Sequence, residues 1–364
     1  MAKIRLDNMG HSYSGTLSEN DYALKPLSME WRDGGAYALL GPSGCGKTTM
    51  LNIISGLVTP SHGKVWFDER DVTGVPAARR NVAHVFQFPV VYQSMTVFEN
   101  LAFPLICRKW PRTRIRSRVG EIAELLELGG KLRAGVRGLT ADEKQLISLG
   151  RGLVRHDVSA VLLDEPLTVI DPQRRLHLRR KLKEIHGRFD LTMLYVTHDQ
   201  NEAMTFADEV VMMNHGRVVQ VGTPADLFEA PLTRFVGYFI GTPAMNFLAA
   251  EARDGEVRLD GIIVAGGNAG HVPSGPVTIG IRPEYVEFTD SPGRNVLSAT
   301  VVDVLDFGSV RVIDLVVAGR KVKAKLQRER AVPSGDVLIR LPADKIRLYV
   351  DDHLVTAGYA SSKP

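Results

Sequence analysis

The sequence has little cysteine and no long apolar segment. Cys45 and Cys107 are its only two cysteines, and they stand far apart, so they suggest no disulfide framework and fit a reducing cytoplasm. No apolar run reaches the roughly 18 residues that a membrane-spanning helix needs. Residues 1–7 are charged and lack the apolar core of a signal peptide. Any association with a membrane is therefore expected to come through another protein.

The sequence also lacks a strong charge of either sign. Its net charge is only +4, which gives no case for a nucleic-acid partner. Hydrophobic residues make up 44% and charged residues 24%, as in ordinary globular proteins. With 364 residues, the chain is long enough for two or more domains that each have a substantial core.

The first part of the chain alternates apolar strand-like runs with helical patterns. The runs are bounded by Gly, Asp and Pro and lie at residues 4–6, 36–40, 64–67, 82–86, 160–163 and 192–196. Helices are expected from Lys47, over much of 113–149 and over 174–185. This alternation predicts an α/β domain over residues 1–235 with a largely parallel sheet.

The pattern of residue types changes after about residue 235. Short segments rich in β-branched residues, separated by Gly-containing turns, follow at 257–264, 277–281, 297–305, 310–317 and 336–341. This pattern predicts a small all-β domain or barrel over residues 236–364.

A glycine-rich loop between an apolar strand and a helix is the strongest motif. It fits G-x-x-x-x-G-K-[ST], a loop whose backbone N–H groups hold phosphates. Its candidate ligand-binding residues are Gly41, Ser43, Gly44, Cys45, Gly46, Lys47, Thr48 and Thr49. Lys47 is expected to reach the β- and γ-phosphates, and Thr48 to bind Mg²⁺. The alternatives are a glycine-rich turn without a ligand and, for Cys45, a redox role.

Three further strand ends carry polar side chains. Asp164 and Glu165 follow an apolar strand, where Asp164 would bind Mg²⁺ and Glu165 would act on the attacking water. His198 ends another strand and could contact the γ-phosphate or hold the geometry of Glu165 and the water. Gln87 ends a third and could contact Mg²⁺ or water. A strand-end histidine is more often structural, but a shared sheet edge favours the catalytic interpretation.

These elements and their order, with the stretch Leu139–Glu143, resemble the ATP-binding-cassette (ABC) transporter ATPases. Residues 233–247 and Ile281–Glu284 resemble the β-barrel (TOBE) extension of importers for sugars, polyols and glycerol phosphate. The resemblance implies a P-loop ABC ATPase domain with an inserted helical subdomain at about 88–152, followed by that barrel, which is of the OB type. ATP and Mg²⁺ are the cofactors that it implies. It also implies membrane permease subunits, a periplasmic or lipid-anchored substrate-binding protein, and a peripheral position on the cytoplasmic face of the bacterial inner membrane.

The resemblance assigns further roles. Tyr13 would stack on adenine, with Tyr22 as a second candidate. Gln87 and the segment to Asn100 would line the groove that receives a permease helix. Asp171 would lie in a loop crossing the interface between two ATPase subunits, which in this family hold two ATP molecules between them.

The family's Leu-Ser-Gly-Gly-Gln signature is altered in this chain. The signature stretch reads Leu139, Thr140, Ala141, Asp142 and Glu143. Thr140 and Glu143 fit a capping box, so a purely structural interpretation is that the stretch starts a helix well. Such a cap uses the N–H groups that a phosphate needs, and Asp142 adds negative charge. We therefore predict a heterodimer with a second ABC ATPase that carries a regular signature.

The altered stretch, with the barrel extension, also resembles one subunit of bacterial glycerol importers. Alternatives are a homodimeric sugar importer ATPase, a soluble cassette ATPase acting on nucleic acid or ribosomes, and a regulatory binding module. A guanine-nucleotide switch is disfavoured because no Asn-Lys-x-Asp motif is found. The substrate itself cannot be read from this chain, because its recognition belongs to the permease and the binding protein.

Overall fold

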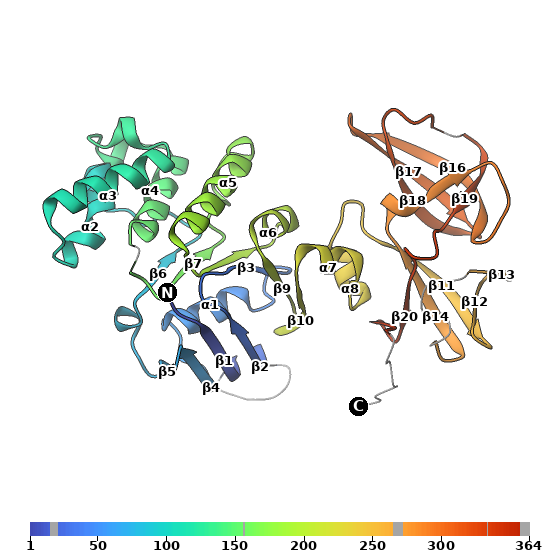
Figure 1. The fold of residues 1–364 in the computed structure, drawn as a ribbon, viewed down its shortest axis with the longest axis horizontal. Helices are drawn as coiled ribbons and strands as arrows, with labels where there is room; N and C mark the ends of the chain where they lie inside the picture. The colour runs from blue at the N-terminus through green and yellow to red at the C-terminus, as the bar shows by residue number, and fades with distance from the viewer. Residues whose placement is uncertain (15–20, 156, 265–271, 333, 357–364) are drawn as a thin grey trace. The chain divides into compact units, whose positions relative to one another are not determined.

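The computed structural model describes residues 1–14, 21–155, 157–264, 272–332 and 334–356 (Figure 1). The chain divides into two compact units, Met1–Pro224 and Ala225–Pro364. The division comes before the predicted boundary at residue 235, because the intervening helices pack within the second unit. Within the described residues, no helix is both long and apolar enough to cross a membrane.

A six-stranded sheet forms the centre of the first unit. Its strands, in sheet order, are β10 (Arg217–Gly222), β9 (Glu209–Asn214), β3 (Ala36–Leu40), β8 (Met193–Thr197), β7 (Ala160–Asp164) and β6 (Val82–Val85). All neighbours pair in parallel except β10, which is antiparallel to β9. Every residue of β3, β7 and β8 is buried, which explains their continuous apolar runs. The predicted parallel sheet is confirmed.

A second, antiparallel sheet packs in the same unit. Its order is β2 (Tyr22–Trp31), β1 (Ile4–Ser12), β4 (His62–Phe67) and β5 (Arg70–Asp71). The predicted runs at 4–6 and 64–67 therefore form this sheet instead of extending the parallel one. Apolar residues from both sheets and from α1 (Lys47–Ser55) form one core.

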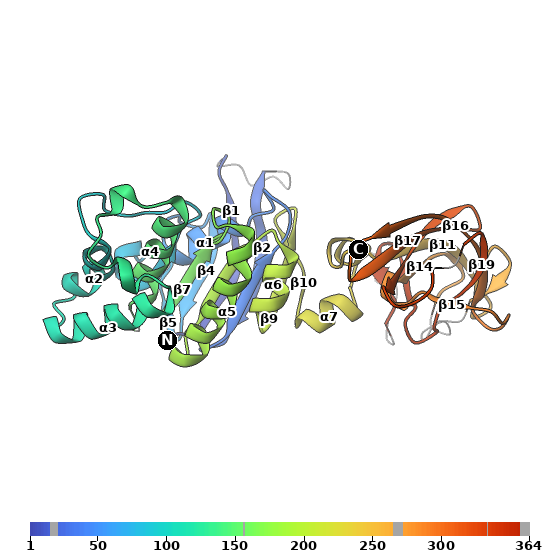
Figure 2. The same ribbon diagram turned by 90° about the horizontal axis from the view of Figure 1, so that it is seen from above.

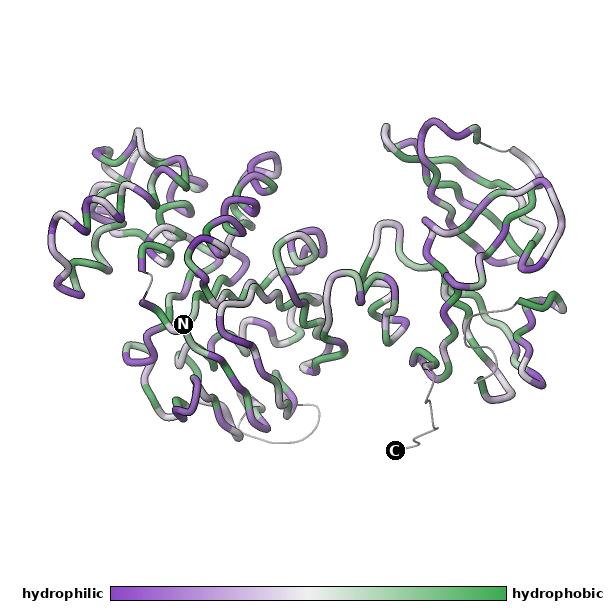
Figure 3. The backbone as a smooth tube through the Cα atoms, in the orientation of Figure 1, coloured by the Kyte–Doolittle hydropathy of each residue, from purple (hydrophilic) through white to green (hydrophobic). Residues whose placement is uncertain are grey.

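The remaining helices of this unit form two groups. The helices are α2 (Val97–Cys107), α3 (Arg112–Leu125), α4 (Ala141–Leu153), α5 (Pro172–Phe189) and α6 (Gln200–Phe206), with 3-10 turns η1 (Ala77–Arg79), η2 (Gly129–Lys131) and η3 (Val136–Gly138). Figures 1 and 2 show α2, α3 and α4 gathered together, as the predicted helical insertion requires. Helix α6 packs on β3 and β8, with α5 beside it. Helix α5 is mostly hydrophilic (Figure 3), and few of its residues are buried.

The second unit contains two antiparallel sheets around a shared apolar core. The first is β13 (Ile262–Ile263), β12 (Glu256–Leu259), β11 (Asn246–Arg253), β14 (Gly275–Ile281), β20 (Arg347–Val350) and β21 (His353–Leu354). The second is β15 (Glu287–Thr289), β19 (Asp336–Arg340), β16 (Val296–Asp306), β17 (Val310–Val317) and β18 (Arg320–Gln327). The predicted segment 257–264 is a hairpin rather than one strand, because Asp260 and Gly261 turn the chain with positive φ angles.

A buried arginine attaches two short helices to this unit. The helices are α7 (Pro224–Glu229) and α8 (Arg234–Phe239). The Arg282 guanidinium, 1% exposed, donates to the carbonyls of Phe228 at 3.0 Å and Gly237 at 2.9 Å. It also donates to the carbonyls of Leu227 and Ile240. These contacts explain why residues 225–240 belong to the second unit.

Candidate nucleotide-binding site

The glycine-rich loop joins β3 to α1, as predicted. Gly46 precedes the helix with φ of 102°, and a Cβ there would lie 2.6 Å from the carbonyl oxygen of Ala23, so only glycine fits. Lys47 Nζ donates to the carbonyls of Gly41 at 2.8 Å and Pro42 at 2.9 Å. The loop borders a cavity of about 190 Å³, lined by Ala23, Ser43, Gly44, Gly46, Lys47, Thr48, Thr49 and Glu165. Most of the predicted phosphate-binding residues therefore share one cavity with Glu165, whereas Gly41 and Cys45 do not line it.

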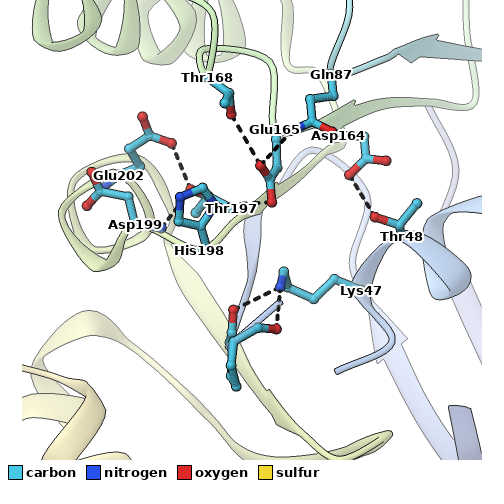
Figure 4. Close-up of polar contacts among 12 residues, drawn as sticks. Lys47, Thr48, Gln87, Asp164, Glu165, Thr168, Thr197, His198, Asp199 and Glu202 are labelled. Carbon is cyan, nitrogen blue, oxygen red and sulfur yellow. Dashed lines mark hydrogen bonds and ion pairs between the residues drawn. The ribbon is translucent and has the colours of Figure 1, made fainter. Parts of the chain in front are cut away.

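Two oxygen-bearing side chains meet beside the phosphate loop. The Thr48 hydroxyl donates to Asp164 Oδ1 at 3.2 Å, and Asp164 ends β7 and is buried (Figure 4). Burial raises the pKa of Asp164, while the hydrogen bond from Thr48 lowers it. Hydroxyl and carboxylate oxygens are ligands that suit Mg²⁺. The residues present therefore fit a magnesium ion.

Cys45 lies inside the loop but is buried. Burial raises the pKa of its thiol, and the nearby Lys47 opposes that shift. A raised pKa disfavours the reactive thiolate, so the geometry supports a small packing residue rather than a redox role.

Glu165 is the point where the predicted strand ends converge. Its Oε1 lies 3.1 Å from His198 Nδ1, and its Oε2 accepts from Gln87 Nε2 and from the Thr168 hydroxyl, each at 3.2 Å (Figure 4). Because β6, β7 and β8 are neighbours in the parallel sheet, the residues that follow them meet at one edge. This arrangement brings together Gln87, Asp164, Glu165 and His198.

Several polar residues at this edge were not predicted from the sequence. Gln145 is fully buried in α4, and its Nε2 donates to the carbonyls of Phe86 at 3.1 Å and Pro166 at 2.9 Å. It therefore joins α4 to the segments that carry Gln87 and Glu165. Thr168, Thr197 and Glu202 were also missed. A glutamine on the buried face of a helix is the one signal that could have revealed Gln145.

The two candidate adenine-stacking tyrosines differ in their contacts. Tyr13 is 64% exposed, and its hydroxyl lies 3.3 Å from the Thr49 hydroxyl beside the phosphate loop. Tyr22 instead pairs its hydroxyl with His62 Nε2 at 3.2 Å, with the two rings edge to face. Tyr13 therefore has both the exposure and the location that stacking on a nucleotide base requires.

The signature stretch forms the helix start that its sequence predicts. Thr140 is the N-cap of α4, and its side chain accepts from Glu143 N, while the Glu143 carboxylate accepts from Thr140 N at 3.0 Å. This confirms the capping box. Glu143 also pairs with Lys131, and that ion pair together with the capping bonds holds the pKa of its carboxyl below the usual range.

Asp142 is held by the segment that begins α5. Its Oδ2 accepts from Asp171 N at 3.4 Å and lies 3.7 Å from the Arg174 guanidinium. The Asp171 carboxylate in turn caps α5 by accepting from Gln173 N at 2.9 Å. The polar contacts of Asp142 therefore join the signature stretch to the predicted interface loop, not to the phosphate loop of the same chain.

Comparison with known proteins agrees with this geometry. Residues 24–168 match the ABC transporter family, and residues 241–286 match the MalK OB fold domain. The chain is 37% identical to the sn-glycerol-3-phosphate import ATP-binding protein UgpC of Ralstonia nicotianae, over 94% of each chain. It is 39% identical to the trehalose/maltose import ATP-binding protein MalK of Thermococcus litoralis, over 90% of this chain and 93% of that protein.

The fold is also similar to that of solved ATP-binding cassettes. The dimeric ATP-binding cassette MJ0796, bound to ADP and Pi, is 27% identical with a TM-score of 0.54. The similarity covers 61% of this chain and 98% of that one.

Proposed function

The chain belongs to the ABC transporter ATP-binding proteins, as its motifs predicted, and we propose that it hydrolyses ATP to drive uptake of a small polyol, carbohydrate or glycerol phosphate through a partner permease. The observation that carries this proposal is the convergence of Gln87, Glu165 and His198 beside the cavity of the phosphate loop. Both relatives named above are import ATP-binding proteins, one for sn-glycerol 3-phosphate and one for trehalose and maltose.

The contacts support a role for each side chain. Lys47 is held by two loop carbonyls and would exchange them for the β- and γ-phosphates of ATP. Thr48, Asp164 and Gln87 would hold Mg²⁺, which neutralises the phosphate charge. Glu165 would orient and deprotonate the attacking water, and His198 would contact the γ-phosphate. Tyr13 would stack on the adenine.

The altered signature stretch supports an asymmetric pair. In α4 the capping box occupies N–H donors that a partner's γ-phosphate would otherwise receive. Asp142 places a carboxylate at the same helix end, and Arg174 neutralises it only from one side at 3.7 Å. We therefore infer that a second ABC ATPase with a regular signature completes this chain's own ATP site. A homodimer of this chain is the alternative.

The proposed assembly contains permease subunits in the membrane and a substrate-binding protein on the opposite side of it. The ATPase would lie on the cytoplasmic face of the bacterial inner membrane, bound to integral-membrane permease subunits through the groove near residues 87–100. A periplasmic or lipid-anchored binding protein would deliver the substrate. Phe88, 69% exposed, and Val90, 50% exposed, provide apolar surface in this segment for contact with a permease.

Purification of the assembled transporter tests this function. The chain is co-expressed with the permease and ATPase genes beside it, and ATP hydrolysis is compared with that of the chain alone. We expect the mixed assembly to hydrolyse ATP at least tenfold faster, and Glu165→Gln in this chain to abolish most of that activity. Equal rates for the chain alone and the mixed assembly would disprove the asymmetric pair. If the chain neither binds a permease nor hydrolyses ATP, the transport function is wrong.

A further inference from the structure

A buried carboxylate lies behind the loop that carries His198. Glu202, in α6, is only 5% exposed. Its Oε2 accepts from the Tyr195 hydroxyl at 3.0 Å and from the Thr197 hydroxyl at 2.8 Å. An ionisable group is costly to bury without such partners, so packing alone does not explain a glutamate at this position.

The Thr197 hydroxyl links Glu202 to the backbone beside His198. It donates to Glu202, and it accepts from the backbone N–H of Asp199 at 3.0 Å (Figure 4). Thr197 and Asp199 are the two chain neighbours of His198. A hydroxyl whose proton is directed at Glu202 presents its lone pairs to Asp199. The peptide units on both sides of His198 are thus tied to one buried side chain.

Asp199, on the other side of His198, contacts the start of α6, the helix that carries Glu202. The Asp199 carboxylate caps α6 by accepting from Asn201 N at 2.7 Å and from Glu202 N at 3.4 Å. These bonds close a ring that contains Thr197, Asp199 and Glu202. The His198 side chain itself is 53% exposed, so side-chain packing does little to hold it. Its position depends mainly on the backbone that this ring fixes.

We propose that Glu202 is a positioning residue for His198 in ATP hydrolysis. Through Thr197, it holds the loop so that His198 Nδ1 stands 3.1 Å from the Glu165 carboxylate, beside the cavity where the γ-phosphate would lie. This inference rests on the proposed ATPase function. It differs from a general structural role because it predicts an effect on catalysis that passes through His198.

The first test compares three variants in the full chain, assembled with its partners. Glu202→Ala removes the acceptor of both hydroxyls, and we expect kcat to fall at least tenfold while KM for MgATP stays within twofold. Glu202→Gln keeps an oxygen that can accept both hydroxyls, so it should retain kcat within threefold. Glu184→Ala is the matched control, because Glu184 lies on α5 with its side chain 50% exposed. A kcat for Glu202→Ala above half the wild-type value overturns the proposal.

The second test asks whether the effect passes through His198. In a His198→Ala background, adding Glu202→Ala should lower the remaining kcat by less than twofold. A further tenfold loss in that background would mean that Glu202 supports the fold and not His198, which overturns the proposal. If Glu202→Ala does not fold, Thr197→Val replaces it, since it has nearly the same shape and removes the hydroxyl that joins the two.

The two proposals fail in different ways. Absence of ATP hydrolysis by the unmodified assembly, or full activity of Glu165→Gln, contradicts the proposed function. Normal hydrolysis with a sensitive Glu165, combined with additive effects of Glu202→Ala and His198→Ala, contradicts only the role of Glu202.

Discussion

The carboxylate of Glu165 and the imidazole of His198 face each other at 3.1 Å from the ends of adjacent parallel strands. Gln87 and Thr168 hold the other oxygen of the same carboxylate. Glu165 is therefore oriented by its contacts with Gln87, Thr168 and His198. A general base that is already oriented loses little conformational freedom during the reaction.

Replacing Glu165 tests its role as the base. Glu165→Gln keeps the size of the side chain but removes its ability to take a proton, so kcat should fall by about 100-fold or more. ATP binding should persist, because the phosphate loop is unchanged. Phosphate release at saturating MgATP and binding of a fluorescent ATP analogue measure the two effects. Hydrolysis within threefold of wild type would rule out general-base catalysis by Glu165.

Restoring glycine at Asp142 tests the altered signature stretch. Unit charges 4 Å apart at an effective dielectric of 20 repel by about 4 kcal/mol, and Arg174 already offsets part of this repulsion. We expect Asp142→Gly, in the Glu165→Gln background with ATP, to tighten homodimer association by about tenfold, or roughly 1.4 kcal/mol. Analytical ultracentrifugation measures the association.

Asp142→Asn is the matched control for this experiment, because it removes the charge and keeps the bulk. If Asp142→Asn and Asp142→Gly both leave the dissociation constant of the homodimer unchanged, the carboxylate does not weaken the site.

His84 should make the first unit sensitive to acid. Both of its ring nitrogens are buried without a hydrogen-bond partner, and burial lowers its pKa to about 4. In the unfolded chain the pKa of His84 is near 6.5, so the unfolded state binds a proton more readily than the folded state. The contribution of neutral His84 to the free energy of unfolding is therefore present at neutral pH and is lost as the pH falls from about 6.5 towards 4. Between pH 7 and pH 5 the loss attributable to His84 is about 2 kcal/mol.

His84→Phe should remove this part of the pH dependence, since a phenyl ring can still stack on Phe86. Urea unfolding followed by tryptophan fluorescence reports the first unit, because all three tryptophans lie there. His353→Gln, in the second unit, is the control. An equal loss of stability on acidification in His84→Phe and wild type would show that another group is responsible.

Arg282 should be essential for the attachment of α7 and α8. Arg282→Met leaves several buried carbonyls without their donor, and we expect the free energy of local opening to fall by about 3 kcal/mol. Hydrogen exchange of the α8 amides, measured by mass spectrometry, gives this free energy directly. Arg340→Met, which removes an exposed ion pair with Glu287, should leave α8 protected. Unchanged exchange in Arg282→Met would assign the attachment to apolar packing.

Local sequence patterns predicted the phosphate loop and its neighbours because each depends on short-range chemistry. The start of α1 at Lys47 and the Thr140–Glu143 capping box depend on residues only a few positions apart. Strand β18 was missed because its lysines alternate with buried Val322, Ala324 and Leu326, so no apolar run marks it.

The polar network behind the site depends on contacts that only the folded chain creates. Gln145 meets Phe86, and Asp142 meets Arg174, across large separations in sequence. Glu202 lies close to Thr197 in sequence, but its burial depends on how α6 packs against the sheet. No pattern of residue types specifies such pairings without the topology.

Because Thr140 caps α4, the start of this helix can fold whether or not a phosphate is bound there. The side chains of Thr140 and Glu143 already accept from two N–H groups at this helix start, so the helix does not need a bound phosphate for its stability. A nucleotide should therefore raise the melting temperature of this chain through its own phosphate loop alone. Orthovanadate, which mimics the transferred phosphoryl group, should accordingly be trapped with a stoichiometry of one per ATPase pair.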